Sequence, residues 1–289
     1  MSMAADAAKK TVGTLAVLAA LAPVAASAAT PLDLYYERTL MSTAQSRCGL
    51  FTAPIGAALE ASAAQARGAA LRGGADMAQV RTTAAHAVAK IDEVGCNSAD
   101  LRVAAQRVRS AFEAWTHVTR MTFPGEAGGW KADRTAYRSA QWKLVQPSKA
   151  LGSPVQFGMA GRGSGAVLLT VAEFPDGARP YAARLVFRDA ARAPNPWLGA
   201  PSSRPLPPRA ASRAVMAQDK ADADPMLAWG HAGAVAFRFP TEAADALSGL
   251  DPREQFAVEF LFPGDQVRTA RFEVGDFAAG RAFLKLGGA

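Results

Sequence analysis

Cysteine and histidine, the residues that most often build redox and metal sites, are scarce in this chain of 289 residues. It has two cysteines, Cys48 and Cys96, and three histidines. The cysteines lie too far apart for the C-x-x-C pair of a redox enzyme and are too few for a zinc ribbon. In an exported protein they instead predict a disulfide, because oxidising compartments permit one. Two buried thiols are the alternative.

The three histidines do not predict a metal centre or a catalytic triad. His86 and His117 fall on expected helices about 200° from the apolar stripes, and their positions differ by roughly 18 Å along the helix axis. Both are therefore expected at the surface. His231 lies in the glycine-containing loop Trp229–Gly233 and is expected to be solvated. The sequence predicts no metal and no cofactor.

Two carboxylates, Glu259 and Glu273, fall on one face of two neighbouring expected strands. A glycosidase needs such a pair facing each other across a cleft. In the register that pairs Phe256 with Phe272, Arg271 lies between the two acids. That placement favours a solvent-exposed charge cluster, which contributes little to the stability of the fold. We predict no catalytic residues.

The stretch Trp130–Arg138 is the best candidate for a binding site. It combines the aromatic residues Trp130 and Tyr137 with charged residues at the expected domain junction, where pockets often form. A hydrolase that uses carboxylates on an envelope polymer would draw on the same groups. In the structural alternative, the aromatic residues pack the interface and the charges are solvated. The candidate binding residues are Trp130, Asp133, Arg134, Tyr137 and Arg138.

A glycine loop, Gly161–Ala166, matches the dinucleotide fingerprint G-x-G-x-x-A by letter. The fingerprint holds a pyrophosphate only where a helix follows the loop. Here Val167–Val171 follows, which is typical of a strand. The loop is therefore interpreted as a hairpin connection.

Apolar residues spaced three and four apart predict four helices, at about 33–47, 54–72, 76–94 and 98–119. These helices position the two cysteines. Such faces pack into an antiparallel bundle with short loops. Alternating helix directions bring Cys48 and Cys96 to the same end of the bundle. A bridge there stabilises the fold by about 3–4 kcal/mol in the chain-entropy model. The expected stripes of the first, second and fourth helices are Leu34, Leu40, Met41 and Ala44; Ile55, Leu59, Ala63, Ala66 and Ala70; and Leu101, Ala105, Val108, Phe112, Trp115 and Thr119.

The second half of the chain changes to the two-residue period of strands. Strands are expected at 141–146, 155–160, 166–174 and 181–188, as an antiparallel meander. Two loops follow, a proline-rich one at 193–209 that we expect to be stiff and extended, and a polar one at 218–225. A β-α-β-β-α unit ends the chain. The predicted fold class is α+β, with a helical bundle at 29–122, a junction at 123–135 and a β-rich domain at 136–289.

The N-terminus predicts export. Lys9 and Lys10 precede the short apolar run Val12–Leu21, and the small residues Ala25–Ala29 follow. Charge, apolar core and A-x-A site together indicate a secretory signal peptide, residues 1–28, cleaved after Ala28. The apolar run is too short to span a bilayer. We therefore expect a periplasmic or secreted protein without a transmembrane segment in the mature chain.

The net charge of +7 is weak evidence for a nucleic-acid partner. The basic residues are scattered along the chain, whereas a polyanion footprint clusters on one face or helix. Removal of the signal peptide leaves +6, from 30 basic and 24 acidic residues. We predict no nucleic-acid binding.

The C-terminal segment Phe272–Leu284 follows the strand order described above and places Gly275–Phe277 before a short terminal helix. In these features it resembles the invasion-associated locus B proteins, small exported β-rich proteins of alphaproteobacteria. The resemblance covers about fifty residues, and at most the sheet from about Arg138. The helical half has no counterpart in that family, and the cysteines that the family carries in its β domain are missing here. The resemblance implies an envelope or secreted interaction protein and supplies no catalytic residues.

These observations together predict a non-enzymatic exported protein that binds an envelope component, either a protein or a glycan. A carboxylate-based hydrolase is the first alternative. A β domain that binds a small ligand without chemistry is the second.

Overall fold

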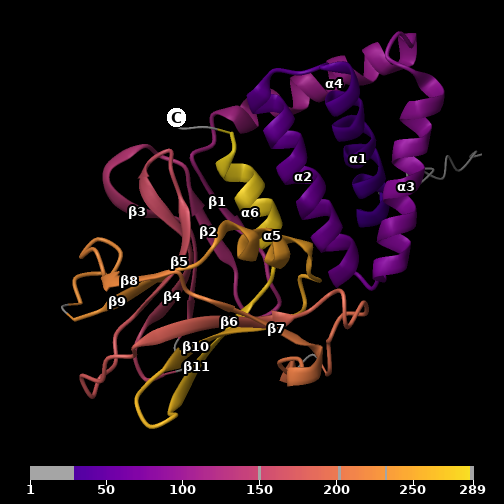
Figure 1. The fold of residues 1–289 in the computed structure, drawn as a ribbon. Helices are drawn as coiled ribbons and strands as arrows, with labels where there is room; N and C mark the ends of the chain where they lie inside the picture. Colours follow the sequence, from indigo (N-terminus) through magenta and orange to yellow (C-terminus); the bar gives the residue numbers. More distant parts are fainter. Residues whose placement is uncertain (1–28, 149–150, 201–202, 232, 287–289) are drawn as a thin grey trace, which may run out of the picture.

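The computed structural model describes residues 29–148, 151–200, 203–231 and 233–286. The expected signal peptide, residues 1–28, lies outside them. The fold is α+β, as predicted: helices come first and antiparallel sheets follow (Figure 1). Among the described residues, no helix combines the length and hydropathy needed to cross a bilayer.

Four helices form the N-terminal part, close to their expected positions. Thr30 and Asp76 each close a capping box at the start of a helix, and Ser98 caps another. α1 lies between α2 and α3, while α4 crosses one end of this layer instead of running alongside it (Figure 1). The fourth helix thus departs from the simple bundle expected. The helices are α1 (Pro31–Cys48), α2 (Ala53–Arg72), α3 (Met77–Val94) and α4 (Ala99–Thr116).

The predicted disulfide is confirmed. Cys48 and Cys96 are bridged, with their Cα atoms 5.6 Å apart. The bridge joins the end of α1 to the loop after α3, because both helices run toward the same end of the layer. It closes the helical part around a small apolar core that includes Met41, Leu59 and Ile91.

Two antiparallel sheets form the rest of the molecule. The larger has the order β1-β2-β3-β4-β5-β9-β8 and the smaller the order β11-β10-β6-β7. The predicted register of Phe256 opposite Phe272 is confirmed in the β10–β11 hairpin. The strands of the larger sheet are β1 (Arg120–Phe123), β2 (Trp130–Asp133), β3 (Tyr137–Ser148), β4 (Val155–Gly163), β5 (Val167–Ala172), β8 (Asp219–Asp222) and β9 (Val235–Arg238); those of the smaller are β6 (Ala182–Arg188), β7 (Ser212–Met216), β10 (Gln255–Leu261) and β11 (Val267–Glu273).

The main core lies between the two sheets, where aromatic side chains from both meet. The Phe157 ring of the larger sheet lies 4.9 Å from that of Phe256 and 5.5 Å from that of Phe272 in the smaller sheet. Such contacts add about 0.5–1.5 kcal/mol each beyond the burial of their area. All three rings are buried. This core holds the two sheets as one body.

Two short helices, α5 (Thr241–Gly249) and α6 (Phe277–Leu284), connect the sheets to the helical part. α6 packs against α2 on one side and against β1, β2 and β3 on the other (Figure 1). Phe277 and Phe283 of α6 are buried in the main core, together with Ala58 and Ala61 of α2. The helical part is therefore anchored to the sheets through α6.

The path of the strands differs from the expected meander. β3, β4 and β5 are neighbours as predicted, but β6 leaves them and pairs with β10 and β7 in the smaller sheet. The polar loop expected at 218–225 contains a strand, β8, which forms the exposed edge of the larger sheet. In the proline-rich loop, residues 193–200 and 203–208 form neither α-helix nor strand. The C-terminal unit has its expected element order but spans both sheets, because β9 belongs to the larger one.

The change from helix to sheet falls at residues 117–119, ahead of the junction expected at 123–135. Residues 120–133 form the first hairpin of the larger sheet, β1 and β2, with a loop between them. Of the candidate residues, Trp130, Asp133, Tyr137 and Arg138 therefore lie on strands, and Arg134 lies in the short connection between β2 and β3.

Candidate functional site

The candidate residues around β2 divide between the core and the surface. Trp130 is fully buried, and its indole Nε1 donates a hydrogen bond to the carbonyl of Val274 at 2.8 Å. Its ring lies 4.9 Å from that of Phe277. Trp130 therefore joins β2 to the start of α6 and is closed to a ligand.

Arg134 is also buried, and its guanidinium joins three elements. Nε donates to the carbonyl of Val118 at 2.6 Å, Nη2 donates to the carbonyl of Thr116, and the group lies over the Phe283 ring at 5.5 Å. Burial lowers the pKa of this guanidinium. These contacts bind the last turn of α4 to the sheet and to α6, so Arg134 positions the helical part.

The half-buried residues Asp133 and Tyr137 form a cluster with the exposed Arg120. Arg120 donates from Nε to Asp133 Oδ2 and from Nη2 to the Tyr137 hydroxyl, each at 2.8 Å. Although burial acts to raise it, hydrogen bonds from Thr135 and Arg120 hold the pKa of Asp133 below its usual value. The cluster borders an open hollow of about 430 Å³. Its carboxylate is kept ionised, which suits a general acid poorly. Arg138 is exposed and does not line this hollow.

The two carboxylates of the C-terminal hairpin do not share a solvent face. Glu273 is buried, and its carboxylate accepts the backbone N–H groups of Glu126, Ala127 and Gly128. Glu259 pairs with Arg184 of β6 at 2.6 Å, not with Arg271. The expected charge cluster is therefore wrong. The sequence did not reveal the true partners because both are distant along the chain: the β1–β2 loop binds Glu273, and β6 supplies the partner of Glu259.

A second acid, Glu126, lines a hollow of about 350 Å³ together with Glu273, beside the proline-rich loop. Arg204 of that loop donates two hydrogen bonds to Glu126, both at 2.9 Å. Each acid thus already accepts hydrogen bonds from groups within the protein. These contacts favour a structural role for both acids, since they join the β1–β2 loop to β11 and to the proline-rich loop.

Three further ion pairs each contain a buried carboxylate. Arg188 of β6 pairs with Glu254, and the second pair joins Arg253 to Asp251. The third, between Arg72 of α2 and Asp276 of α6, is bidentate at 2.7 and 2.9 Å. Burial raises the pKa of Asp276, although Arg72 opposes that effect. All three pairs are saturated within the protein and offer no open group to a ligand.

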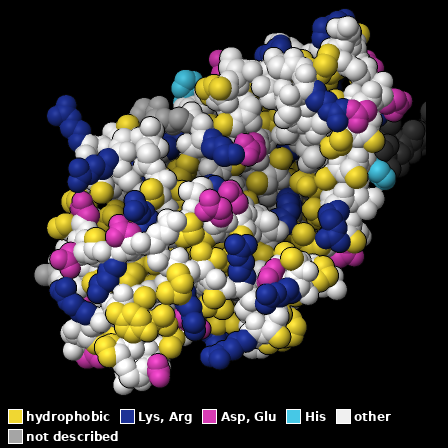
Figure 2. All heavy atoms as spheres, viewed as in Figure 1, with side chains coloured by type: hydrophobic (Ala, Val, Ile, Leu, Met, Phe, Trp, Pro, Cys, Tyr) yellow, Lys and Arg dark blue, Asp and Glu magenta, His cyan; other side chains and the backbone are white. Residues whose placement is uncertain are grey.

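The histidines lie apart. His86 and His117 are exposed on the helical part, whereas His231 Nδ1 lies 2.8 Å from Glu173 Oε2. In the part of the chain that the structure describes, no three metal-binding side chains gather. Figure 2 shows Lys and Arg interspersed with Asp and Glu over the visible face, without a continuous basic field.

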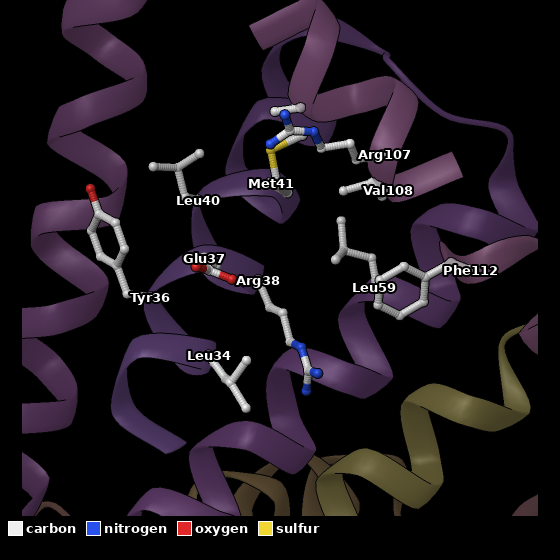
Figure 3. A pocket seen from close by; sticks show the side chains of 11 residues that line it. Leu34, Tyr36, Glu37, Arg38, Leu40, Met41, Leu59, Arg107, Val108 and Phe112 are labelled. Carbon is white, nitrogen blue, oxygen red and sulfur yellow. The ribbon is translucent and has the colours of Figure 1, made fainter. Parts of the chain in front are cut away.

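A hollow between α1, α2 and α4 is the candidate functional site. It has a volume of about 450 Å³ and a mostly apolar lining. Met41 and Leu59 are buried at its base, and Leu34, Val108 and Phe112 are half-buried around it. In Figure 3, Leu59 and Phe112 lie together on one side, while Tyr36 and Leu40 point away from them. The hollow exists because α4 crosses the layer, which leaves part of each apolar stripe without a partner.

Charged side chains border this hollow at its two ends. Arg38 lies at the Leu34 end and Arg107 at the Met41 end (Figure 3). Arg38 Nη1 donates to the carbonyl of Ser62 at 3.2 Å. Burial lowers the pKa of Arg38, and the neighbouring Glu37 opposes that shift. The site therefore combines an apolar base with a cationic rim.

No family model, curated protein or solved structure matches this chain. The resemblance of the C-terminal segment to the invasion-associated locus B proteins stays a prediction. Function must therefore be argued from the geometry.

Sequence reasoning placed the lining residues on packing stripes and did not expect a hollow there. Leu34, Met41, Leu59, Val108 and Phe112 all belong to predicted stripes. One signal of an uncovered stripe was available. The fourth helix carries an apolar stripe as long as that of a central helix, although it is the last helix of the bundle and has few neighbours to cover it. Its crossing angle, which decides how much of that stripe is covered, cannot be obtained from spacing.

Proposed function

We propose that this protein is an exported, non-enzymatic binding protein that holds the apolar part of a small envelope component in the hollow between α1, α2 and α4. The observation that carries the proposal is the hollow itself. Its volume of about 450 Å³ lies within the roughly 300–1,000 Å³ of typical ligand sites. The predicted signal peptide supports export. The ligand site is thereby assigned to the helical part, not to the β-rich part considered from the sequence.

The energetics favour an apolar occupant. Leu34, Val108 and Phe112 remain half-exposed around the hollow, and covering apolar surface contributes about 25 cal/mol per Å². Each methylene that a ligand buries there adds about 0.8 kcal/mol, which corresponds to roughly fourfold in affinity. A ligand with a short alkyl or aryl group would therefore bind with useful strength through the base of the hollow alone.

The remaining candidate groups support binding over chemistry. The carboxylates of Asp133, Glu126 and Glu273 all accept hydrogen bonds from permanent donors. These contacts hold the three carboxylates within the fold, which supports binding over the hydrolase alternative.

The test is binding of the uncharged fluorescent probe phenylnaphthylamine to the purified protein. We expect saturable binding. Ala104→Trp, which fills the hollow from α4, should weaken it at least about tenfold, because a bulky ring displaces the probe's apolar contacts. Ala114→Trp is the matched control, since Ala114 is exposed on the same helix and lies outside the hollow. Absence of saturable binding, or equal binding by both variants, contradicts the proposal.

Export is tested separately. We expect the protein to be released by osmotic shock of a Gram-negative host and to begin at Ala29. Retention in the cytoplasm with residues 1–28 intact would argue against an envelope role.

A further inference from the structure

We infer that the ligand of this hollow is a single-chain alkyl carboxylate, whose headgroup is bound by Arg107. The inference rests on the proposed function, since it needs the hollow to hold the alkyl chain. It names the headgroup, the residue that recognises it and the end of the hollow at which it lies.

Arg107 differs from the other arginines of α4 because its guanidinium has no partner among the described residues. Arg102 donates to the carbonyl of Asn97 at 3.1 Å. Arg109 donates to the carbonyl of Leu50, also at 3.1 Å. Arg107 makes neither a hydrogen bond nor an ion pair within the part of the chain that the structure describes. Its five N–H donors are therefore open to a ligand.

Arg107 also lies where the hollow meets solvent. It lines the hollow beside Met41 and Val108, and it lines a second, shallower depression on the outer side of α4 with Val103 and Ala111. A guanidinium at this edge can meet a hydrated headgroup while the attached chain enters the apolar base. A long arginine side chain suits such a place because its stem packs on apolar surface and its charge stays in water.

The opposite end of the hollow is less suited to an anion. Arg38 already donates to the Ser62 carbonyl, and Glu37 lies next to it on the rim. Figure 3 shows the successive residues Glu37 and Arg38 of α1 side by side, away from Arg107. The net positive charge therefore lies at the Arg107 end, which sets the direction of the ligand.

The dimensions favour one chain and one small anion. Leu34 and Met41 line the hollow seven residues apart on α1, which corresponds to a length of about 10 Å. A volume of about 450 Å³ lies in the lower half of the usual range for small ligands. A single guanidinium fork matches one carboxylate with two parallel hydrogen bonds. A two-chain lipid or a multiply charged headgroup would need more room or more donors.

The test compares three amphiphiles that share one alkyl chain, measured by calorimetry and by displacement of phenylnaphthylamine. Laurate is the anion, dodecylammonium the cation and dodecyl maltoside the neutral control. We expect laurate to bind most tightly. Arg107→Gln should raise its Kd at least about tenfold, the usual effect of losing hydrogen bonds to a charged group, and leave dodecyl maltoside unchanged.

Two further variants make the result specific. Arg102→Gln removes the same charge from the same helix outside the hollow, so laurate binding should be retained. Arg107→Glu should abolish the preference for laurate and favour dodecylammonium, because Arg107 is exposed and its replacement does not disturb the core.

The inference is overturned if Arg107→Gln leaves laurate binding unchanged, or if it weakens all three amphiphiles equally. If phenylnaphthylamine binds but the three amphiphiles bind with equal affinity, only this inference is overturned. Failure of every amphiphile and of the probe to bind would overturn the proposed function as well.

Discussion

The contact between Gly68 of α2 and Asp276 at the start of α6 gives the sharpest test of how the helical part is held. A Cβ atom at Gly68 would lie 2.9 Å from Asp276 Cγ and closer still to Oδ1. Asp276 cannot move aside easily, because its buried carboxylate is bound at both oxygens by Arg72. Gly68→Ala must therefore separate the two helices or break the ion pair.

The magnitude follows from three terms. Overpacking a core contact costs about 1–3 kcal/mol, and weakened hydrogen bonds between charged groups cost about 1.5–3 kcal/mol. Alanine's better helix propensity returns about 1 kcal/mol. A destabilisation of about 3 kcal/mol results, which for a chain of this size lowers the thermal midpoint by about 6–12 °C.

The assay is thermal and urea unfolding followed by circular dichroism. Gly56→Ala, earlier in α2, is the matched control, because a Cβ there meets only the Gln45 side chain at 3.6 Å. We expect that variant to be as stable as the parent protein or up to about 1 kcal/mol more stable. If Gly68→Ala unfolds at or above the parent midpoint, or if both variants fall by the same amount, the close approach does not anchor α2 to α6.

Three further predictions concern the other links in the fold. Replacing both cysteines with serine should cost about 4 kcal/mol in the chain-entropy model for a separation of 48 residues, measured by urea unfolding; an unchanged midpoint would contradict it. Glu254→Gln leaves Arg188 buried without its counter-ion and should cost about 3–5 kcal/mol, whereas a loss below 1 kcal/mol would show that water reaches the pair. The hydrogen bonds from Arg268 lower the pKa of Asp176 from 3.8 to about 2, so their stabilisation is present above about pH 4 and is lost as the pH falls through about 2. NMR titration of that carboxyl group should show this, and Arg268→Gln should return the pKa towards 3.8.

The helical part could largely be predicted because its information is local. Apolar spacing fixed the helix positions, and Gly73 and Gly95 marked two of the helix ends. Once three successive helices are assigned, their alternating directions place Cys48 and Cys96 at one end without any knowledge of packing angles. The disulfide was therefore predictable from counting alone.

The sheets were predictable only within hairpins. Alternating phenylalanines set the register of β10 and β11, because a shift by one residue would expose every ring. The partner of β6 is set by long-range pairing, so β6 was expected beside β5 when it belongs to the other sheet. β8 was missed for a different reason: all four of its residues are exposed at a sheet edge, which leaves no alternation to detect.

Burial of charge was the least predictable feature. It excluded several residues that the sequence had suggested as site residues. Glu273 was expected in solvent because its strand neighbours alternate correctly, yet the N–H groups that hold it come from a loop about 145 residues earlier. The same reasoning explains why Trp130 and Arg134 are bound within the fold.

Arg107 is the counterexample. It lies beside a stripe that predicts packing, and the structure leaves both the arginine and part of that stripe, Val108 and Phe112, without full cover. The half-exposed part of this stripe costs hydrophobic free energy, since a small change in the angle of α4 could bury it. Arg134 opposes that change, because it fixes the last turn of α4 to the sheet. The hollow is thus maintained by the Arg134 contact at one end of α4, although Arg134 does not line the hollow. A ligand that covers Val108 and Phe112 would gain the hydrophobic free energy of burying them.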